Sequence, residues 1–259
     1  MNIPNIIMQT GKTRKDINKY SIQWQQMNPS FQYIFYDDEE CRTFLQEYFH
    51  SDVIWAFNLL RPGAFKADLF RYCFLYIKGG VYVDLDCVPL IPLLDFLDST
   101  ADFISVSERM GLGIPGVYQA FIACIPGCEI LNDAVNRIVQ NCKERFKPKH
   151  TEWEDILSIT GPVLLSKAMQ NKYKAGRHQI LGLDVLLYSL VENDILDENG
   201  RKIIYTKFDG FAGENYANLV RRNLIYSDST DNLPSRICGI VFIIIMVLVI
   251  RFLIQRVHR

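Results

Sequence analysis

The chain has 259 residues, a length that suits one large catalytic domain or two small ones. Apolar residues make up 49% and charged residues 22% of the sequence, as in a globular protein with a sizeable core. The net charge of −1 provides no overall positive field, which argues against a nucleic-acid binder. The seven cysteines are odd in number and form no Cys-x-x-Cys pair, so neither a disulfide framework nor a zinc site is indicated.

The first fifty residues predict alternating strands and helices. Residues 5–9 predict a strand, residues 16–27 a helix, and the aromatic run 31–36 a second strand. The acidic run 37–40 then opens a helix. Carboxylates in a first turn face the positive end of the helix dipole, so we interpret this run as a cap.

The central part of the chain predicts a helix, a glycine turn and a strand. Apolar residues recur at helical spacing over 64–78, and Gly79-Gly80 ends that helix because glycine accepts the backbone conformation of a C-cap. The β-branched segment 81–85 follows as a strand. Helices and strands mixed in this order predict an α/β domain.

Two carboxylates, Asp84 and Asp86, stand at the end of the strand predicted over 81–85. Residues two apart in a strand share a face, so the pair would project together while Leu85 points into the core. Carboxylates this close repel each other unless a cation lies between them or one takes a proton. Oxygen ligands suit Mg²⁺ or Mn²⁺. The pair alone leaves two interpretations open, a metal site and a solvated strand end.

The preceding helix favours the metal site. Asp68 and Arg71 are three residues apart and therefore lie on one helical face. The glycine turn brings this helix back against the strand that carries Asp84 and Asp86. We therefore expect a polar cluster of three acids and one base on an apolar frame, which suits a sugar diphosphate.

The segment 64–86 resembles the signature of glycosyltransferase family 32, the DXD sugar transferases. This family includes initiating mannosyltransferases and inositolphosphoceramide mannosyltransferases, and the glucosylating clostridial toxins are more distant relatives. Further blocks are similar to the family in the same order: residues 3–10, Trp24 with Asn28-Pro29, residues 119–123 with Pro126-Gly127, and residues 160–162. The resemblance thus covers most of residues 3–170.

The resemblance implies a GT-A fold and a metal-dependent, retaining transfer of a hexose from a UDP- or GDP-sugar to a hydroxyl of a glycan or glycolipid acceptor. It implies that Asp84 and Asp86 bind Mn²⁺ or Mg²⁺ and the donor diphosphate. Asp68 and Arg71 would contact the donor sugar. Gln9 and Thr10, at the end of the first strand, would lie near the nucleotide.

The sequence departs from the family at three positions. The family usually has His where Met8 stands, Trp near Gly11, and Asn where Gln119 stands. The family's late motif is not recognisable either. The corresponding stretch is residues 208–216, where a further metal or diphosphate ligand is expected to be one of three residues: Asp209, Glu214 or Asn215.

The sequence also predicts a membrane anchor. Residues 1–226 form the predicted transferase domain, 227–236 a polar linker, 237–254 a hydrophobic segment and 255–259 a short basic tail. Eighteen helical residues span about 27 Å, which is sufficient to cross a slightly thinned bilayer. No signal peptide is recognisable, so we expect a single-pass membrane protein whose catalytic domain faces the cytosol.

Two alternatives from other classes remain. A haloacid-dehalogenase-like phosphatase would use Asp84 as the nucleophile and Asp86 as the acid–base residue. That fold would leave Asp68 and Arg71 unexplained. The second alternative is an inactive, transferase-like membrane protein. The triplet Gly11-Lys12-Thr13 does not indicate a phosphate-binding loop, because that motif needs a glycine where Ile6 stands; we interpret it as an exposed turn.

Overall fold

The computed structural model describes residues 2–109, 115–147, 153–170, 172, 177–185, 192–207 and 216–227. The chain divides into two compact units, Met1–Tyr226 and Ser227–Arg259. The predicted anchor, residues 237–254, lies outside the described residues. Within the described ranges, no helix is both long and apolar enough to cross a membrane.

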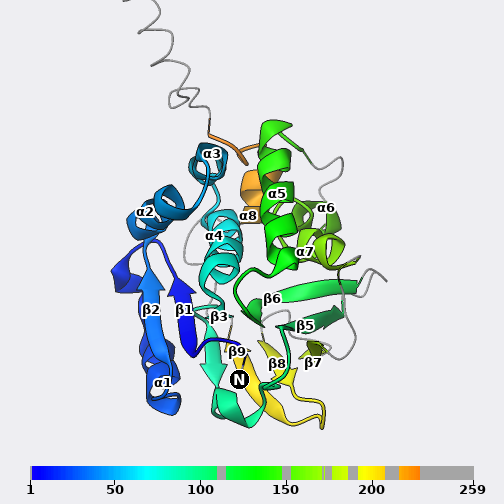
Figure 1. Cartoon of the computed structure of the whole chain (residues 1–259). Coiled ribbons are helices and arrows are strands. Elements are labelled where there is room, and N and C mark those ends of the chain that lie inside the picture. The colour runs from blue at the N-terminus through cyan, green and yellow to red at the C-terminus, as the bar shows by residue number, and fades with distance from the viewer. Residues whose placement is uncertain are drawn as a thin grey trace, which may run out of the picture. The chain divides into compact units, whose positions relative to one another are not determined.

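The first unit is a mixed α/β domain, which confirms the predicted class (Figure 1). Its strands are β1 Ile6–Thr10, β2 Gln32–Tyr36, β3 Gly80–Val83, β4 Cys87–Pro89, β5 Phe103–Arg109, β6 Pro115–Cys124, β7 His178–Val185, β8 Glu192–Leu196 and β9 Lys202–Lys207. Its helices are α1 Lys19–Met27, α2 Asp38–Tyr48, α3 Ser51–Leu59, α4 Gly63–Lys78, α5 Glu129–Lys143, α6 Trp153–Leu157, α7 Pro162–Met169 and α8 Tyr216–Arg221.

The described strands form one sheet in the order β2-β1-β3-β6-β5-β7-β8-β9-β4. Strands β2, β1 and β3 run parallel, and β6 lies antiparallel beside β3. In this register Met8 is opposite Tyr82, which places Thr10 near Asp84 at the carboxyl ends of the parallel strands. Ligands of open α/β sheets bind outside these carboxyl ends.

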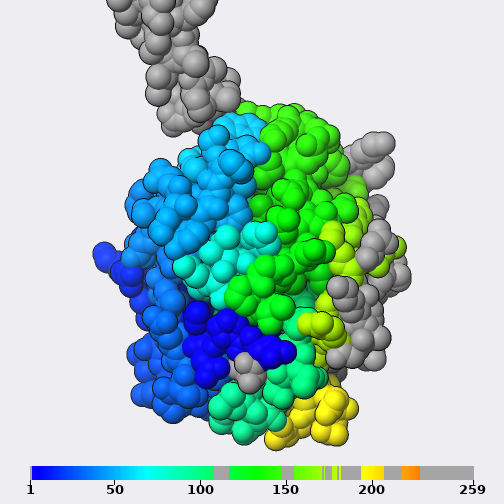
Figure 2. Space-filling view, in the orientation of Figure 1, coloured from blue at the N-terminus to red at the C-terminus, as the bar shows by residue number. Residues whose placement is uncertain are grey.

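The two faces of the sheet pack into separate cores because successive strand residues point to opposite sides. Met8 and Tyr82 join a core built with α2 to α5 and α7. Ile7 and Val81 join the other core, which Trp24 of α1 helps to fill. In the space-filling view, α4 (cyan) is enclosed between the blue α2–α3 segment and the green α5 (Figure 2).

The glycine turn before β3 forms as predicted. Gly79 caps α4 with a φ of 65°, and Gly80 has a φ of 99°. A Cβ atom added at Gly80 would lie 2.8 Å from the carbonyl oxygen of Ile6 on β1. Glycine therefore permits both the reversal of the chain and the close approach of β3 to β1.

Two local predictions are corrected by the structure. The first helix begins at Lys19 instead of residue 16, because residues 14–16 form a 3-10 turn and Asn18 caps the helix. The predicted strand 81–85 ends at Val83. Residues 84–86 instead form a turn in which the amide of Cys87 donates to the carbonyl of Asp84, and Leu85 is only half-buried. The acidic run does cap α2, as predicted: the Asp37 carboxylate accepts from the amides of Glu39 and Glu40.

Candidate functional site

The predicted pair on α4 forms as the helical spacing requires. Arg71 Nη2 lies 3.2 Å from Asp68 Oδ1, one turn apart on the same helical face. Both side chains are almost fully buried, at 6% and 9% exposure. A buried charge is costly unless it is paired, so these two side chains need polar partners inside the protein.

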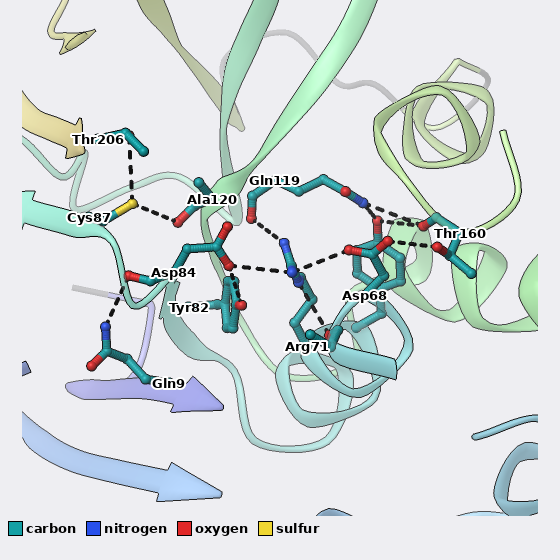
Figure 3. Close-up of polar contacts among 12 residues, drawn as sticks. Gln9, Asp68, Arg71, Tyr82, Asp84, Cys87, Gln119, Ala120, Thr160 and Thr206 are labelled. Atoms are coloured by element: carbon teal, nitrogen blue, oxygen red, sulfur yellow. Dashed lines mark hydrogen bonds and ion pairs between the residues drawn. The ribbon is translucent and has the colours of Figure 1, made fainter. Parts of the chain in front are cut away.

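Arg71 connects α4 to the middle of β6 and to the end of β3 (Figure 3). Its Nη1 donates to the backbone carbonyl of Gln119 on β6 at 2.8 Å. Its Nη2 also lies 3.4 Å from Asp84 Oδ1 just after β3, and the guanidinium lies 4.3 Å from the centroid of the Tyr82 ring. Although burial opposes its charge, the carboxylates of Asp84 and Asp68 raise the pKa of Arg71. The structure therefore brings Asp68, Arg71 and Asp84 together, as the sequence predicted.

Asp84 is held on one side and open on the other. Its Oδ1 accepts from the Tyr82 hydroxyl and faces Arg71. Burial raises the pKa of Tyr82 well above its ordinary value, so the phenol stays protonated and donates. The Asp84 side chain is 32% exposed, and among the described residues its hydrogen bond and its ion pair both go to Oδ1 and not to Oδ2. This oxygen is free to accept a ligand.

Asp68 is anchored from its other side by a second network. Its Oδ2 accepts from the Thr160 hydroxyl at 2.7 Å. The hydroxyl of Tyr72 donates to the Thr160 carbonyl at 3.3 Å and accepts from the Gln119 amide. Burial raises the pKa of Asp68 to about 6, a shift that Arg71 and Thr160 partly offset.

Asp86 lies two residues beyond Asp84, at the far end of the turn. The chain leaves the sheet after Val83, so the alternation of a strand does not put these two carboxylates on one face. Their relative position is set by the turn that follows. Asp86 is half-buried. Among the described ranges, no group of three or more His, Cys, Asp or Glu side chains is arranged to hold a metal ion. In this part of the chain, Asp84 and Asp86 are thus the two candidate protein ligands.

A cavity of about 490 Å³ adjoins the carboxyl end of β1. Thr10, Gly11 and Lys12 line one side of it, and the first turn of α4 lines another. Lys66 reaches in from α4, and its Nζ lies 3.9 Å from Asp38 Oδ2. Burial lowers the pKa of Lys66. The cavity thus has cationic groups at the sheet edge where Asp84 is also found, a combination that suits an anionic ligand.

The other residues predicted from the sequence differ in whether they line this cavity. Thr10 lines the cavity, whereas Gln9 is fully buried and does not. The Gln9 amide donates to the Asp84 carbonyl at 3.1 Å and accepts from the Tyr33 hydroxyl at 2.8 Å, so it supports the turn from behind. Met8 packs in the core. Asp209, Glu214 and Asn215 lie outside the described residues.

Three residues of this network were not identified as site residues from the sequence: Tyr82, Gln119 and Thr160. Tyr82 had a usable signal, because it stands two residues before Asp84 and shares its face of the strand. Gln119 and Thr160 belong to the blocks described above as similar to the family, but their contacts span 47 and 92 residues of chain. Sequence spacing carries no information about such pairs.

Residues 14–104 match a family described as the glycosyltransferase sugar-binding region containing the DXD motif. The chain is 26% identical to the initiation-specific alpha-1,6-mannosyltransferase of Schizosaccharomyces pombe, over 66% of this chain and 48% of that protein. It is 30% identical to the mannosyl phosphorylinositol ceramide synthase SUR1 of Saccharomyces cerevisiae, over 68% of this chain and 44% of that protein.

The matches confirm the resemblance predicted from the sequence. The chain spans between a quarter and about half the length of the first curated relatives. Among solved structures, the PaToxG glycosyltransferase aligns with a TM-score of 0.46 and 16% identity, over 66% of this chain and 70% of that chain.

Proposed function

We propose that this chain, whose residues 14–104 carry the sugar-binding region of the DXD glycosyltransferases, transfers a hexose from a nucleotide sugar to an acceptor hydroxyl. The observation that carries the proposal is the buried Arg71 link. It joins Asp68 on α4 to Asp84 at the carboxyl end of β3, beside a cavity with cationic side chains. The resemblance implies a GT-A fold and retention of configuration, and we propose both.

The donor set fits a divalent ion. Mg²⁺ and Mn²⁺ accept oxygen ligands, and Mg²⁺ is usually held by one or two carboxylates together with substrate phosphates. Asp84 offers the open Oδ2, and Asp86 supplies a second carboxylate from the other end of the turn. When bound, the ion would offset the negative charge that grows on the departing diphosphate.

The side chains around this turn orient the donor. Tyr82 and Arg71 hold one oxygen of Asp84, which directs the other outwards. Arg71 also donates to the Gln119 carbonyl and pairs with Asp68, and these contacts fix its buried position. From there its charge acts on the diphosphate. We propose that the nucleotide occupies the cavity beside Thr10, where Lys66 supplies a positive charge.

The proposal for the acceptor rests on the relatives of the chain. The relatives named above are an initiation-specific alpha-1,6-mannosyltransferase and a mannosyl phosphorylinositol ceramide synthase. We propose a glycan or glycolipid hydroxyl as acceptor, and a C-terminal membrane anchor over residues 237–254. Removal of residues 237–259 should release the protein from the membrane fraction; retention there would overturn the anchor.

The test is donor turnover with and without the two carboxylates. We expect nucleotide release from a panel of UDP- and GDP-hexoses with Mn²⁺, and its loss in Asp84→Asn with Asp86→Asn. Asp133→Asn, at a half-buried carboxylate of α5 that pairs with Arg137, is the control. Turnover that survives the double substitution would overturn the metal site. Hydrolysis of a generic phosphate ester, indifferent to nucleotide sugars, would favour the phosphatase instead.

A further inference from the structure

The turn that carries the two carboxylates is held from behind by the N-terminal part of the chain. Three side chains of this part each donate one hydrogen bond to a carbonyl of the turn. The bonds are Gln9 Nε2 to Asp84 O at 3.1 Å, Asn18 Nδ2 to Leu85 O at 2.8 Å, and Trp24 Nε1 to Cys87 O at 2.9 Å. The carbonyls of Asp84, Leu85 and Cys87 thus each accept from a side chain.

Asn18 uses one end of its amide to cap a helix and the other to bind the turn. Its Oδ1 caps α1 by accepting from the amides of Tyr20 at 2.8 Å and Ser21 at 3.1 Å. Its Nδ2 donates to the carbonyl of Leu85. One side chain therefore couples the start of α1 to the middle of the turn.

The position of that carbonyl matters because a peptide group is planar. The Leu85 carbonyl and the Asp86 amide belong to the same rigid unit of six atoms. A donor that holds this carbonyl therefore restrains the plane that contains the Cα atom of Asp86. The bond from Asn18 thus limits where the Asp86 carboxylate can lie relative to Asp84.

We propose that Asn18 is a positioning residue that sets the backbone of the 84–87 turn and so places the two carboxylates for a divalent ion. The metal-binding part of this inference rests on the proposed function. The backbone part does not, because it concerns a hydrogen bond of the metal-free chain.

Two substitutions separate the donor from the helix cap. Asn18→Asp keeps an oxygen that caps α1, since Asp is as good an N-cap residue as Asn, but it sets a carboxylate oxygen against the Leu85 carbonyl. Asn18→Ser also keeps a cap and removes the donor without this repulsion. Asp37→Asn at the start of α2 is the control, because it exchanges the same two residue types in the reverse direction at the cap of another helix.

The first measurement is amide hydrogen exchange of the peptide that contains residues 84–88, in the metal-free chain. Loss of one hydrogen bond should raise exchange there by about 5- to 10-fold in both Asn18 variants. Exchange at α1, and the melting temperature, should stay close to those of the wild type. Unchanged exchange at the turn in both variants would overturn the proposal.

The second measurement is a titration with Mn²⁺ alone, followed by the electron paramagnetic resonance signal of the free ion. We expect about a 10-fold weaker affinity in Asn18→Asp, a smaller loss in Asn18→Ser and none in Asp37→Asn. Faster exchange with unchanged Mn²⁺ affinity would overturn the link from turn to carboxylates. Absence of Mn²⁺ binding in the wild type would overturn the proposed metal site, and the exchange rates would still decide whether Asn18 sets the turn.

Discussion

Arg71 Nη2 lies 3.4 Å from Asp84 Oδ1, and this contact is made by a guanidinium whose side chain is only 6% exposed. The link joins a helix to the end of a strand at the edge of the sheet where the parallel strands finish. Such a contact has two consequences that can be measured separately. It contributes to stability because it is buried, and it orients Asp84 because it occupies one carboxylate oxygen.

Substitution of Arg71 tests the contribution to stability. Arg71→Met leaves the Asp68 carboxylate and the Gln119 carbonyl without this donor, so we expect the free energy of unfolding to fall by roughly 3–5 kcal/mol. Arg71→Lys keeps the charge but loses the planar fork, and a smaller loss of about 1–3 kcal/mol is expected. Urea unfolding followed by circular dichroism measures both.

The control for this series is an exposed ion pair on α5. Arg137 lies 2.8 Å from Asp133, with its side chain 44% exposed. Arg137→Met should therefore change the free energy of unfolding by about 0.5 kcal/mol or less. If Arg71→Met costs no more than Arg137→Met, the buried link does not stabilise the fold.

The pH dependence of stability tests the environment of Asp68. Burial raises its pKa from the ordinary 3.8 to about 6, against the opposing effects of Arg71 and Thr160 and with a small contribution from Asp84. Between these two values the folded chain binds more protons than the unfolded chain. The contribution of Asp68 to the free energy of unfolding therefore falls as pH rises through this window.

Asp68→Asn removes this titration. We expect the stability of the wild type relative to Asp68→Asn to fall by about 2–3 kcal/mol between pH 4 and pH 6 and to change little above pH 7. Thermal or urea unfolding at each pH gives the difference. Asp98→Asn supplies a control of opposite sign, because hydrogen bonds from Thr100 lower the pKa of that exposed carboxylate. A flat difference for Asp68 would contradict its raised pKa.

The sequence predicts those parts of the site that depend on local spacing. Three residues separate Asp68 from Arg71, and helical geometry alone brings them together. The glycine pair after α4 predicts that the helix returns against the next strand, and the positive φ of both glycines agrees with this. These predictions succeed because the interacting atoms lie within a few residues of each other.

Other parts of the site depend on how distant segments pack. The end of β3 at Val83 is set by pairing with β6, where the last registered pair is Val83 and Phe121, and the following turn is held by Asn18 and Trp24. A strand continued by its β-branched pattern therefore predicts the wrong geometry for Asp84 and Asp86. The role of Gln9 changes for the same reason, because its contact with Asp84 spans 75 residues.

Lys66 offers a test of the cavity as the site of an anionic ligand. Burial lowers the pKa of this lysine, which means that its charge is disfavoured in the folded chain and that the fold gains little from it. Lys66→Met keeps the apolar stem that lines the cavity and removes the charge. We therefore expect an unchanged or higher melting temperature together with about 10-fold weaker binding of UDP and GDP, since a single charge-assisted contact of this kind is worth about 1.5 kcal/mol. Isothermal titration calorimetry measures the affinity directly.

Lys143→Met is the matched control, because Lys143 is exposed on α5 and pairs with Asp52. Equal affinity for the nucleotides in both variants would place the nucleotide outside this cavity.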